Sequence, residues 1–316
     1  MSGFIVLSVA PSDIILDRSC YKWKESSGRN FALDACGPID LFIAMAECEV
    51  NGCRFFYQDR GPKDGRRVPV IVFVHGLLWD SSMFEHQLAA FESSYRCIAI
   101  DLRGQGKTEV TETGYSISDQ GMDIQQIIEH LAIAQYHFVG LSMGGFIGMR
   151  LAAWEPERVL SLTVIGSSAG PEPDKTQVKY RRLAWVTRWF GIGPIASRIM
   201  PIMFGASFMK NALRSGERRH WLGKLKANSK FGVQRATLGV IEREDYRPRL
   251  ELIFCPTLIM VGDEDTATPI AKAEDIVAGV KGAELCVIPQ AGHSASIEQP
   301  EFVSTKITDF LSKLYK

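Results

Sequence analysis

The stretch that decides the fold is "YHFVGLSMGGFIGMRLAA", residues 136–153, in which a short apolar strand turns at Ser142 into an apolar helix. Glycine stands two positions before the serine and two positions after it, at Gly140 and Gly144. Small residues there let the backbone turn sharply and let the helix pack closely against the strand. The motif is also compatible with an inert serine in a glycine-rich turn, so the rest of the chain must decide between the two interpretations.

Strands alternate with helices on both sides of this stretch. Five further apolar runs are typical of strands; they are "VPVIVFVHG" (68–76), "RCIAIDLRG" (96–104), "VLSLTVIGSS" (159–168), "CPTLIMVGDED" (255–265) and "AELCVIP" (283–289). The first two indicate strands that are buried on both faces. Helical spacing separates them over residues 82–93, near 270–280 and from Glu301 onward. The pattern predicts an α/β fold with a mostly parallel, doubly wound sheet of the eight-stranded type.

Two local signals refine this prediction. Asn51–Gly52 lies between the apolar residues 44–50 and 53–59, which is the strongest short signal for a β-hairpin. A helix is expected over residues 117–133, with Ser118 and Asp119 as the candidates for its N-terminal cap.

The strand rhythm breaks between residues 170 and 250. This segment contains no convincing strand but many aromatic, methionine and basic residues. We therefore expect an α/β core over 41–169 and 251–316, interrupted by a helical cap insertion over 170–250. Residues 1–40 are expected to form an irregular N-terminal extension, and a weak secretion signal is the alternative for them.

Composition excludes several classes of function. Lys+Arg and Asp+Glu both number 36, so the formal net charge of zero favours neither nucleic acid nor an anionic membrane as a partner. No segment approaches the length needed to cross a bilayer. The seven cysteines are scattered without C-x-x-C pairs, which argues against a disulfide framework or a zinc site and favours a cytoplasmic location. The sequence makes no prediction of oligomeric state.

Another strand end offers a partner for Ser142. In "VFVHGLL", the backbone N–H of Leu77 follows a buried strand, and it is predicted to pair with the N–H of Met143 as an oxyanion hole. His75, in the same loop, is expected to brace the turn through hydrogen bonds rather than act as a base.

An acid and a base follow later in the chain. Asp265 follows a predicted strand, with Asp263 and Glu264 as local competitors, and His293 lies in the loop after the next strand. The order serine, acid, histidine is the order expected of a catalytic triad on this kind of sheet. Ser142 is therefore predicted to be a nucleophile.

These motifs together resemble the α/β-hydrolase fold superfamily, in its serine-nucleophile branch. The resemblance covers about residues 45–315 and rests on "HGLL", "DLRGQGKT", "GLSMGG", "GDEDTATP" and "GHSASIEQPE". It assigns the acid role to Asp265, which matches the family's G-x-x-D-x-x-x-P pattern. Gln105 replaces a histidine often found in the second loop, and Phe84 stands where the family often has tryptophan.

The resemblance implies a serine esterase or lactonase that works through an acyl-enzyme and needs no metal or cofactor. The chain looks most similar to 3-oxoadipate enol-lactonase-like and carboxylesterase sequences, so the implied substrate is a small ester or lactone. One alternative is a carbon–carbon bond hydrolase of the meta-cleavage type, although such enzymes often have tryptophan where this chain has Ser294. A ligand sensor with slow or no turnover is the non-enzymatic alternative.

The cap is expected to select the substrate. We predict that its large apolar residues line a pocket; they are Trp185, Trp189, Phe190, Met200, Met203 and Phe204. The alternative is that most of them form the core of the cap itself. Arg181, Arg182 and Arg188 either bind a substrate carboxylate or form a solvated helix face.

Overall fold

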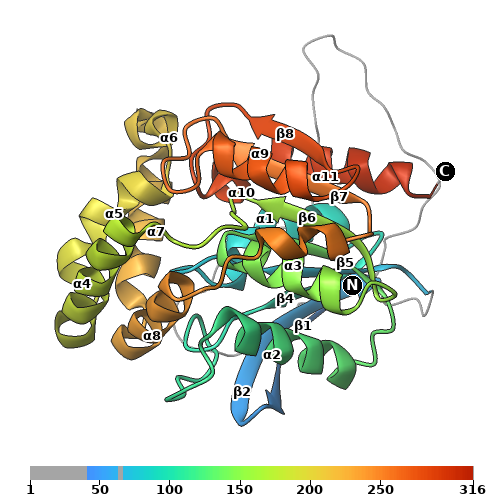
Figure 1. Cartoon of the computed structure of the whole chain (residues 1–316), viewed down its shortest axis with the longest axis horizontal. Helices are drawn as coiled ribbons and strands as arrows, with labels where there is room; N and C mark the ends of the chain where they lie inside the picture. The colour runs from blue at the N-terminus through green and yellow to red at the C-terminus, as the bar shows by residue number, and fades with distance from the viewer. Residues whose placement is uncertain (1–40, 63–66, 316) are drawn as a thin grey trace, which may run out of the picture. The chain divides into compact units, whose positions relative to one another are not determined.

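The computed structural model describes residues 41–62 and 67–315, and in them eight strands form one sheet (Figure 1). The strand order is β1-β2-β4-β3-β5-β6-β7-β8. The strands are β1 (Leu41–Val50), β2 (Cys53–Pro62), β3 (Val70–Val74), β4 (Arg96–Ile100), β5 (Tyr136–Leu141), β6 (Val159–Ile165), β7 (Thr257–Gly262) and β8 (Glu284–Ile288). β2 pairs antiparallel with β1 and β4, and all other neighbours are parallel. The predicted mostly parallel eight-stranded sheet is confirmed.

Helices cover both faces of the sheet. They are α1 (Glu85–Phe91), α2 (Ile117–His130), α3 (Met143–Trp154), α9 (Ile270–Gly279), α10 (Ala295–Glu298) and α11 (Pro300–Lys313). On β3, Val72 and Val74 belong to the apolar cluster that includes α2, α3 and α9, whereas Ile71 and Phe73 belong to the cluster that includes α1 and α11. Alternate side chains of one strand therefore enter two cores, as a doubly wound sheet requires.

The two local signals have different outcomes. Asn51 and Gly52 both have positive φ, 47° and 65°, and they join β1 to β2, so the predicted hairpin is confirmed. The cap of α2 was predicted two residues late. Ser116 is the N-cap, and its hydroxyl accepts from the Asp119 N–H, while the Asp119 carboxylate accepts from the Ser116 N–H. Asp119 thus contributes from inside the helix, as the third helical residue.

The described chain between β6 and β7 contains helices and loops but no strand. They are α4 (Asp174–Phe190), α5 (Ala196–Met203), α6 (Ala206–Lys210), α7 (Ser215–Ala227) and α8 (Lys230–Ile241). Short 3-10 turns occur at Ser81–Phe84, Gly193–Ile195, Ala212–Arg214 and Arg247–Leu252. Figure 1 shows α4 to α8, in yellow-green to orange, gathered to one side of the sheet. We call residues 170–250 the cap segment.

The predictions about membrane helices and cysteines can be compared with the structure only for the described residues, and the prediction for residues 1–40 cannot be compared with it. No helix within residues 41–62 and 67–315 has the length and apolar character needed to cross a bilayer. The five cysteines in these ranges are free thiols, Cys48, Cys53, Cys97, Cys255 and Cys286. Cys20, Cys36 and the whole predicted extension over 1–40 lie outside the described residues.

Candidate active site

Ser142 occupies a strained corner between β5 and α3. Its backbone has φ 52° and ψ −108°, a left-handed conformation that is costly for a residue with a side chain. The glycines around it allow very close packing. A Cβ on Gly144 would lie 2.0 Å from the Val74 carbonyl oxygen, and a Cβ on Gly140 would lie 2.4 Å from the Gly144 carbonyl oxygen. Only glycine fits these two positions, so the G-x-S-x-G spacing has a direct steric cause.

Asp265 and His293 are joined by a hydrogen bond. His293 Nδ1 lies 2.9 Å from Asp265 Oδ2, and because a carboxylate only accepts, Nδ1 is the donor. Three more donors hold the carboxylate: the N–H groups of Ala267 and Thr268, each 2.8 Å from Oδ1, and the Thr268 hydroxyl, 2.7 Å from Oδ2. This arrangement fixes the imidazole tautomer and leaves Nε2 as the acceptor.

The electrostatics of the pair are mutually consistent. Burial opposes the charged form of His293, but the charge and hydrogen bond of Asp265 outweigh it, so the pKa of His293 is raised above its ordinary value. Burial likewise opposes ionisation of Asp265, but His293 and the bonds from Thr268 lower the pKa of that carboxyl. Asp265 is therefore ionised at neutral pH and stabilises a proton on His293.

Ser142 and His293 line one cavity of about 150 Å³ between the sheet and the cap segment. Much of the remaining wall is apolar and comes from the loop after β3, from α3 and from cap helices; representative residues are Leu77, Phe146, Ile199, Met203 and Val233. The structure thus brings together the three side chains predicted as nucleophile, acid and base, although they lie far apart in the sequence. A carbonyl carbon in this cavity would meet a serine and an imidazole in a largely water-poor environment.

The predicted oxyanion donors lie beside the serine. Met143 is the first residue of α3, so its N–H has no partner within the helix. Leu77 is in the loop after β3 and lines the cavity. The next residue, Leu78, has a positive φ of 76°, and its N–H donates to the side-chain oxygen of Gln105 at 2.7 Å. Gln105 therefore braces the loop that presents Leu77.

His75 supports the same loop. Its Nε2 accepts from the Leu102 N–H at 2.8 Å, and its Nδ1 lies 2.7 Å from the Gly76 carbonyl oxygen. Complete burial is the main reason why the pKa of His75 is lowered, so the ring is neutral with its proton on Nδ1. The expectation that His75 has a structural role is confirmed by these two bonds.

Comparison with known proteins identifies the family. A family model described as "alpha/beta hydrolase fold" matches residues 69–192. 3-Oxoadipate enol-lactonase 2 of Acinetobacter baylyi is 30% identical over 234 residues, which cover 74% of this chain and 85% of that protein. The chain belongs to the α/β-hydrolase fold family.

Other relatives agree with this membership. A putative carbamate hydrolase, RutD, of Variovorax paradoxus is 29% identical over 82% of this chain and 96% of that protein. Among solved structures, the enol-lactonase of Burkholderia xenovorans superposes with a TM-score of 0.79 at 26% identity, covering 84% of this chain and 100% of that one. A thermophilic esterase of Thermogutta terrifontis reaches 0.77 at 28% identity, covering 88% and 100%.

The pocket residues predicted for this α/β hydrolase need correction. Of the predicted set, only Met203 lines the cavity. Trp185, Trp189 and Phe190 are 61%, 61% and 68% exposed on the outer face of α4, so the prediction for them is wrong. Met200 and Phe204 are buried in the core shared by cap and sheet, where Phe204 stacks on Phe208 at 4.4 Å.

The cationic cap residues also point away from the cavity. Arg181 is exposed and pairs with Glu242 at 2.8 Å, and Arg182 and Arg188 are exposed as well. They form a solvated helix face, which was the simpler of the two interpretations.

Two supporting residues were missed by sequence reasoning. Trp79 Nε1 donates to the Ser294 hydroxyl at 3.1 Å, which ties the loop after β3 to the loop of His293. The buried Glu298 carboxylate accepts from the N–H groups of Gly205 and Gly292, at 2.8 and 3.0 Å. Burial is the main cause that raises the pKa of Glu298 to about 7. The single carboxyl in "SASIEQP", close after His293, was the only available signal.

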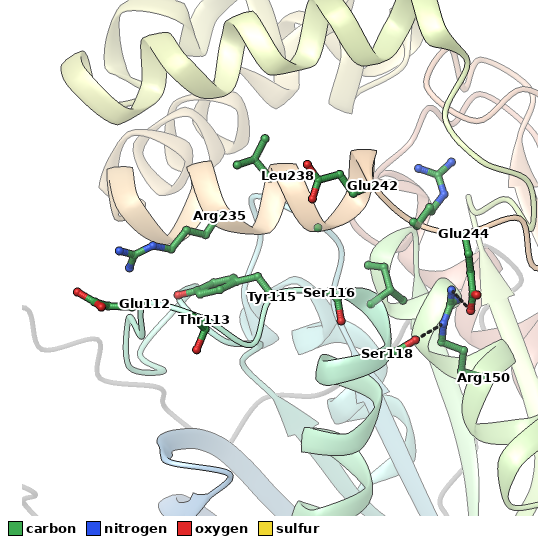
Figure 2. Close-up of a pocket in the computed structure, with 13 residues that line it drawn as sticks. Glu112, Thr113, Tyr115, Ser116, Ser118, Arg150, Arg235, Leu238, Glu242 and Glu244 are labelled. Atoms are coloured by element: carbon green, nitrogen blue, oxygen red, sulfur yellow. Dashed lines mark hydrogen bonds and ion pairs between the residues drawn. The ribbon is translucent and has the colours of Figure 1, made fainter.

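A second hollow, of about 380 Å³, lies between α8 and the loop before α2 (Figure 2). Figure 2 shows Arg150 there, connected to Ser118 and Glu244, and its guanidinium also donates to the Phe146 carbonyl oxygen. None of the three predicted catalytic side chains is among the described residues that line this hollow. Arg150 pairs with Glu244 within it, whereas Glu242 and Arg243 pair with Arg181 and Glu172, which do not line it. We do not assign this hollow to the active site.

Proposed function

We propose that this chain is a serine hydrolase that cleaves a carboxylic ester or lactone through an acyl-enzyme. Ser142 is the nucleophile, His293 the general base and Asp265 the residue that orients it. The observation that carries the proposal is the hydrogen-bonded Asp265–His293 pair, 2.9 Å between Oδ2 and Nδ1, on a cavity that Ser142 also lines. These are the parts required for nucleophilic catalysis by a hydroxyl group.

The first half-reaction forms the acyl-enzyme. His293 Nε2 takes the proton of the Ser142 hydroxyl as Oγ attacks the carbonyl carbon, and the Asp265 carboxylate stabilises the imidazolium that results. The Leu77 and Met143 N–H groups bind the oxyanion of the tetrahedral intermediate. Loss of one such donor costs about 10²–10³ in rate in well-studied enzymes. Collapse of this intermediate breaks the bond to the alkoxide, which leaves with the proton from His293, and the acyl group stays on Ser142 Oγ.

The second half-reaction restores the enzyme. The neutral imidazole of His293 takes a proton from water as the water attacks the acyl carbon. Collapse of the second tetrahedral intermediate breaks the bond to Ser142 Oγ, which regains its proton from His293. Each step uses residues of this chain alone.

The relatives support the ester or lactone assignment. Similar proteins are named enol-lactonase and esterase, and another is named a putative carbamate hydrolase. All three names describe attack on an activated carbonyl carbon. We favour an ester or lactone over a carbamate because enol-lactonase is the name shared by a curated relative and a solved structure.

Release of 4-nitrophenol from its acetate, butyrate and octanoate esters tests the proposal. The wild type is expected to hydrolyse at least one ester, and Ser142→Ala is expected to lose the activity while keeping the far-UV circular dichroism of the wild type. A folded wild type without turnover on these esters, on enol-lactones and on 4-nitrophenyl carbamates would contradict the proposal. Turnover of a meta-cleavage product alone would favour the carbon–carbon hydrolase, and binding without turnover would favour the sensor.

A further inference from the structure

Three residues with a formal charge line the cavity of Ser142, and two of them neutralise each other. Glu172 and Arg243 form an ion pair at 3.0 Å, and both side chains are almost fully buried. Arg243 also donates to the carbonyl oxygens of Gly170 and Val240. This pair joins the two ends of the cap segment and leaves no net charge in the cavity.

The third charged residue is Lys272, on the first turn of α9. Its side chain is half-buried and, in the part of the chain that the structure describes, it makes no hydrogen bond or ion pair. Glu274 and Asp275 are the nearest acidic residues in sequence, and neither forms an ion pair with Lys272 among the described residues. The two oxygens of Asp265 are already bonded by His293, Ala267 and Thr268. The ammonium group therefore has no anion of its own.

The position of Lys272 is electrostatically unfavourable for the fold. The first turn of a helix carries partial positive charge, and a cation there is destabilising. α9 has no acidic residue in its first turn to offset this. A cation that lies in the first turn of a helix without a compensating contact is a candidate for a functional role, because it does not stabilise the fold.

Lys272 also lies close enough to His293 to affect it. Its positive charge opposes protonation of the imidazole and offsets part of the effect of Asp265. Ser142, His293 and Lys272 line the same cavity, so a substrate bound there has the Lys272 side chain along the wall that carries the reacting groups.

We propose that Lys272 binds a carboxylate of the substrate, so that the substrate class is an ester or lactone carrying a second, anionic group. The inference rests on the proposed function and deepens it. By sequence alone, Arg181, Arg182 and Arg188 are candidate ligands for a substrate carboxylate, but these residues face solvent. We assign that role to Lys272 on α9. A charge-assisted hydrogen bond from a half-buried ammonium favours the anionic over the neutral form of the same compound.

Two matched pairs of substrates test this inference. Mono-4-nitrophenyl adipate and its methyl ester differ by one charge on the acyl side, and 3-acetoxybenzoate and its methyl ester differ by one charge on the leaving-group side. The measured quantity is kcat/KM for the acid divided by kcat/KM for its methyl ester. Because both values come from the same enzyme, a change in the pKa of His293 cancels in this ratio.

We expect Lys272→Met and Lys272→Gln to lower the ratio by about ten- to a hundredfold in at least one pair, and Lys272→Arg to retain part of it. Lys281→Met, which removes an exposed lysine beyond the other end of α9, is the control and should leave the ratio unchanged.

The outcomes separate the inference from the proposed function. Ratios that stay within about threefold of the wild type in both pairs, for both substitutions, would overturn the role of Lys272. If the neutral esters were still cleaved in a Ser142-dependent reaction, the proposed hydrolase would stand. Absence of all Ser142-dependent turnover in a folded wild type would overturn the proposed function and the inference together.

Discussion

At the scale of single residues, the candidate site depends on a few positions where neighbouring backbone atoms leave no room for a side chain. Ser142 holds a left-handed conformation because β5 and α3 are packed through glycine on both sides of it. Strain of this kind persists only when the surrounding structure imposes it, and it occurs most often at functional sites. The same packing places Ser142 on the cavity wall and makes Met143 the first residue of α3.

The steric argument predicts opposite effects for two glycine-to-alanine substitutions. Gly144→Ala would place a methyl group 2.0 Å from the Val74 carbonyl oxygen, so we expect a loss of about 1–3 kcal/mol in the free energy of unfolding and at least about a hundredfold loss of kcat. The exposed Gly223 in α7 has open space where a Cβ would lie, and Gly223→Ala should stabilise by up to about 1 kcal/mol. Urea unfolding and ester turnover check both.

A Gly144→Ala protein with the unfolding free energy and the ester turnover of the wild type would contradict the account of the corner at Ser142. So would a Gly223→Ala protein as damaged as Gly144→Ala.

The raised pKa of His293 predicts the pH dependence of catalysis. Only neutral His293 acts as a base, so kcat/KM should increase with pH through a midpoint above the ordinary value of about 6.5. Asp265→Asn removes the charge that raises this pKa and leaves the burial that lowers it. The midpoint should therefore move to lower pH, with a loss of about 10⁴ in kcat. A midpoint that stays in place would show that Asp265 does not control His293.

At the scale of helices and strands, the sheet was predictable and the pocket was not. The strands from β3 to β8 are short, mostly apolar runs, and the Asn51–Gly52 turn marks the longer β1 and β2, so local sequence is enough to recognise them. The corner at Ser142 was predictable for the same reason, because Gly140 and Gly144 each lie only two residues from the serine in sequence. The cap helices were predicted as helices, but nothing local says which face of a helix another element covers.

α4 illustrates this limit. Its small residues Ala184 and Thr187 are buried and line the cavity, while the large Trp185 and Trp189 face outward. α4 packs against α8, and close contact between two helices favours small side chains. The size of a residue therefore suggested the wrong face. The role of Gln105 had no signal either, because a loop amide can bond in any direction.

The corrected cavity predicts which cap residues control the length of the acyl chain. Trp189→Ser should leave the order of preference among acetate, butyrate and octanoate unchanged, because the side chain is 61% exposed. Met203→Trp should reduce octanoate turnover at least about tenfold relative to acetate, because it fills a cavity of about 150 Å³. Reversed results in the chain-length series would mean that the face of α4 that carries Trp189 lines the cavity.

At the scale of the molecule, the cap segment is fastened to the core beside the candidate site. Glu298 bonds the N–H of Gly205 in the cap and of Gly292 in the loop of His293. The Ser294 N–H donates to the carbonyl oxygen of Met203, and Ser207 donates to Glu264. The position of the cap segment and the placement of His293 therefore depend on the same few bonds.

Glu298 predicts a stability change that depends on pH. Its pKa of about 7 lies above the ordinary value, so the stability contributed by its protonated form is full below about pH 4.3 and is lost as the pH increases through 7. Glu298→Gln keeps one acceptor for two N–H groups, and should cost about 1–3 kcal/mol. We expect this cost to be larger at about pH 5.5 than at about pH 8.5 in urea unfolding.

A cost that is equal at both pH values, or larger at the higher one, would contradict this account of Glu298. Glu301→Gln, on an exposed side chain at the start of α11, is the matched control and should change stability little at either pH.

The central claim is that Ser142 is activated by His293 and Asp265 as a nucleophile, and labelling with a fluorophosphonate tests it most directly. The reagent reacts with activated serines and needs no knowledge of the substrate. We predict one adduct per chain in the intact mass, located on Ser142 by peptide mapping, absent in Ser142→Ala and strongly slowed in His293→Ala and Asp265→Asn. A folded wild type that takes no label, or takes it on another residue, would contradict the account.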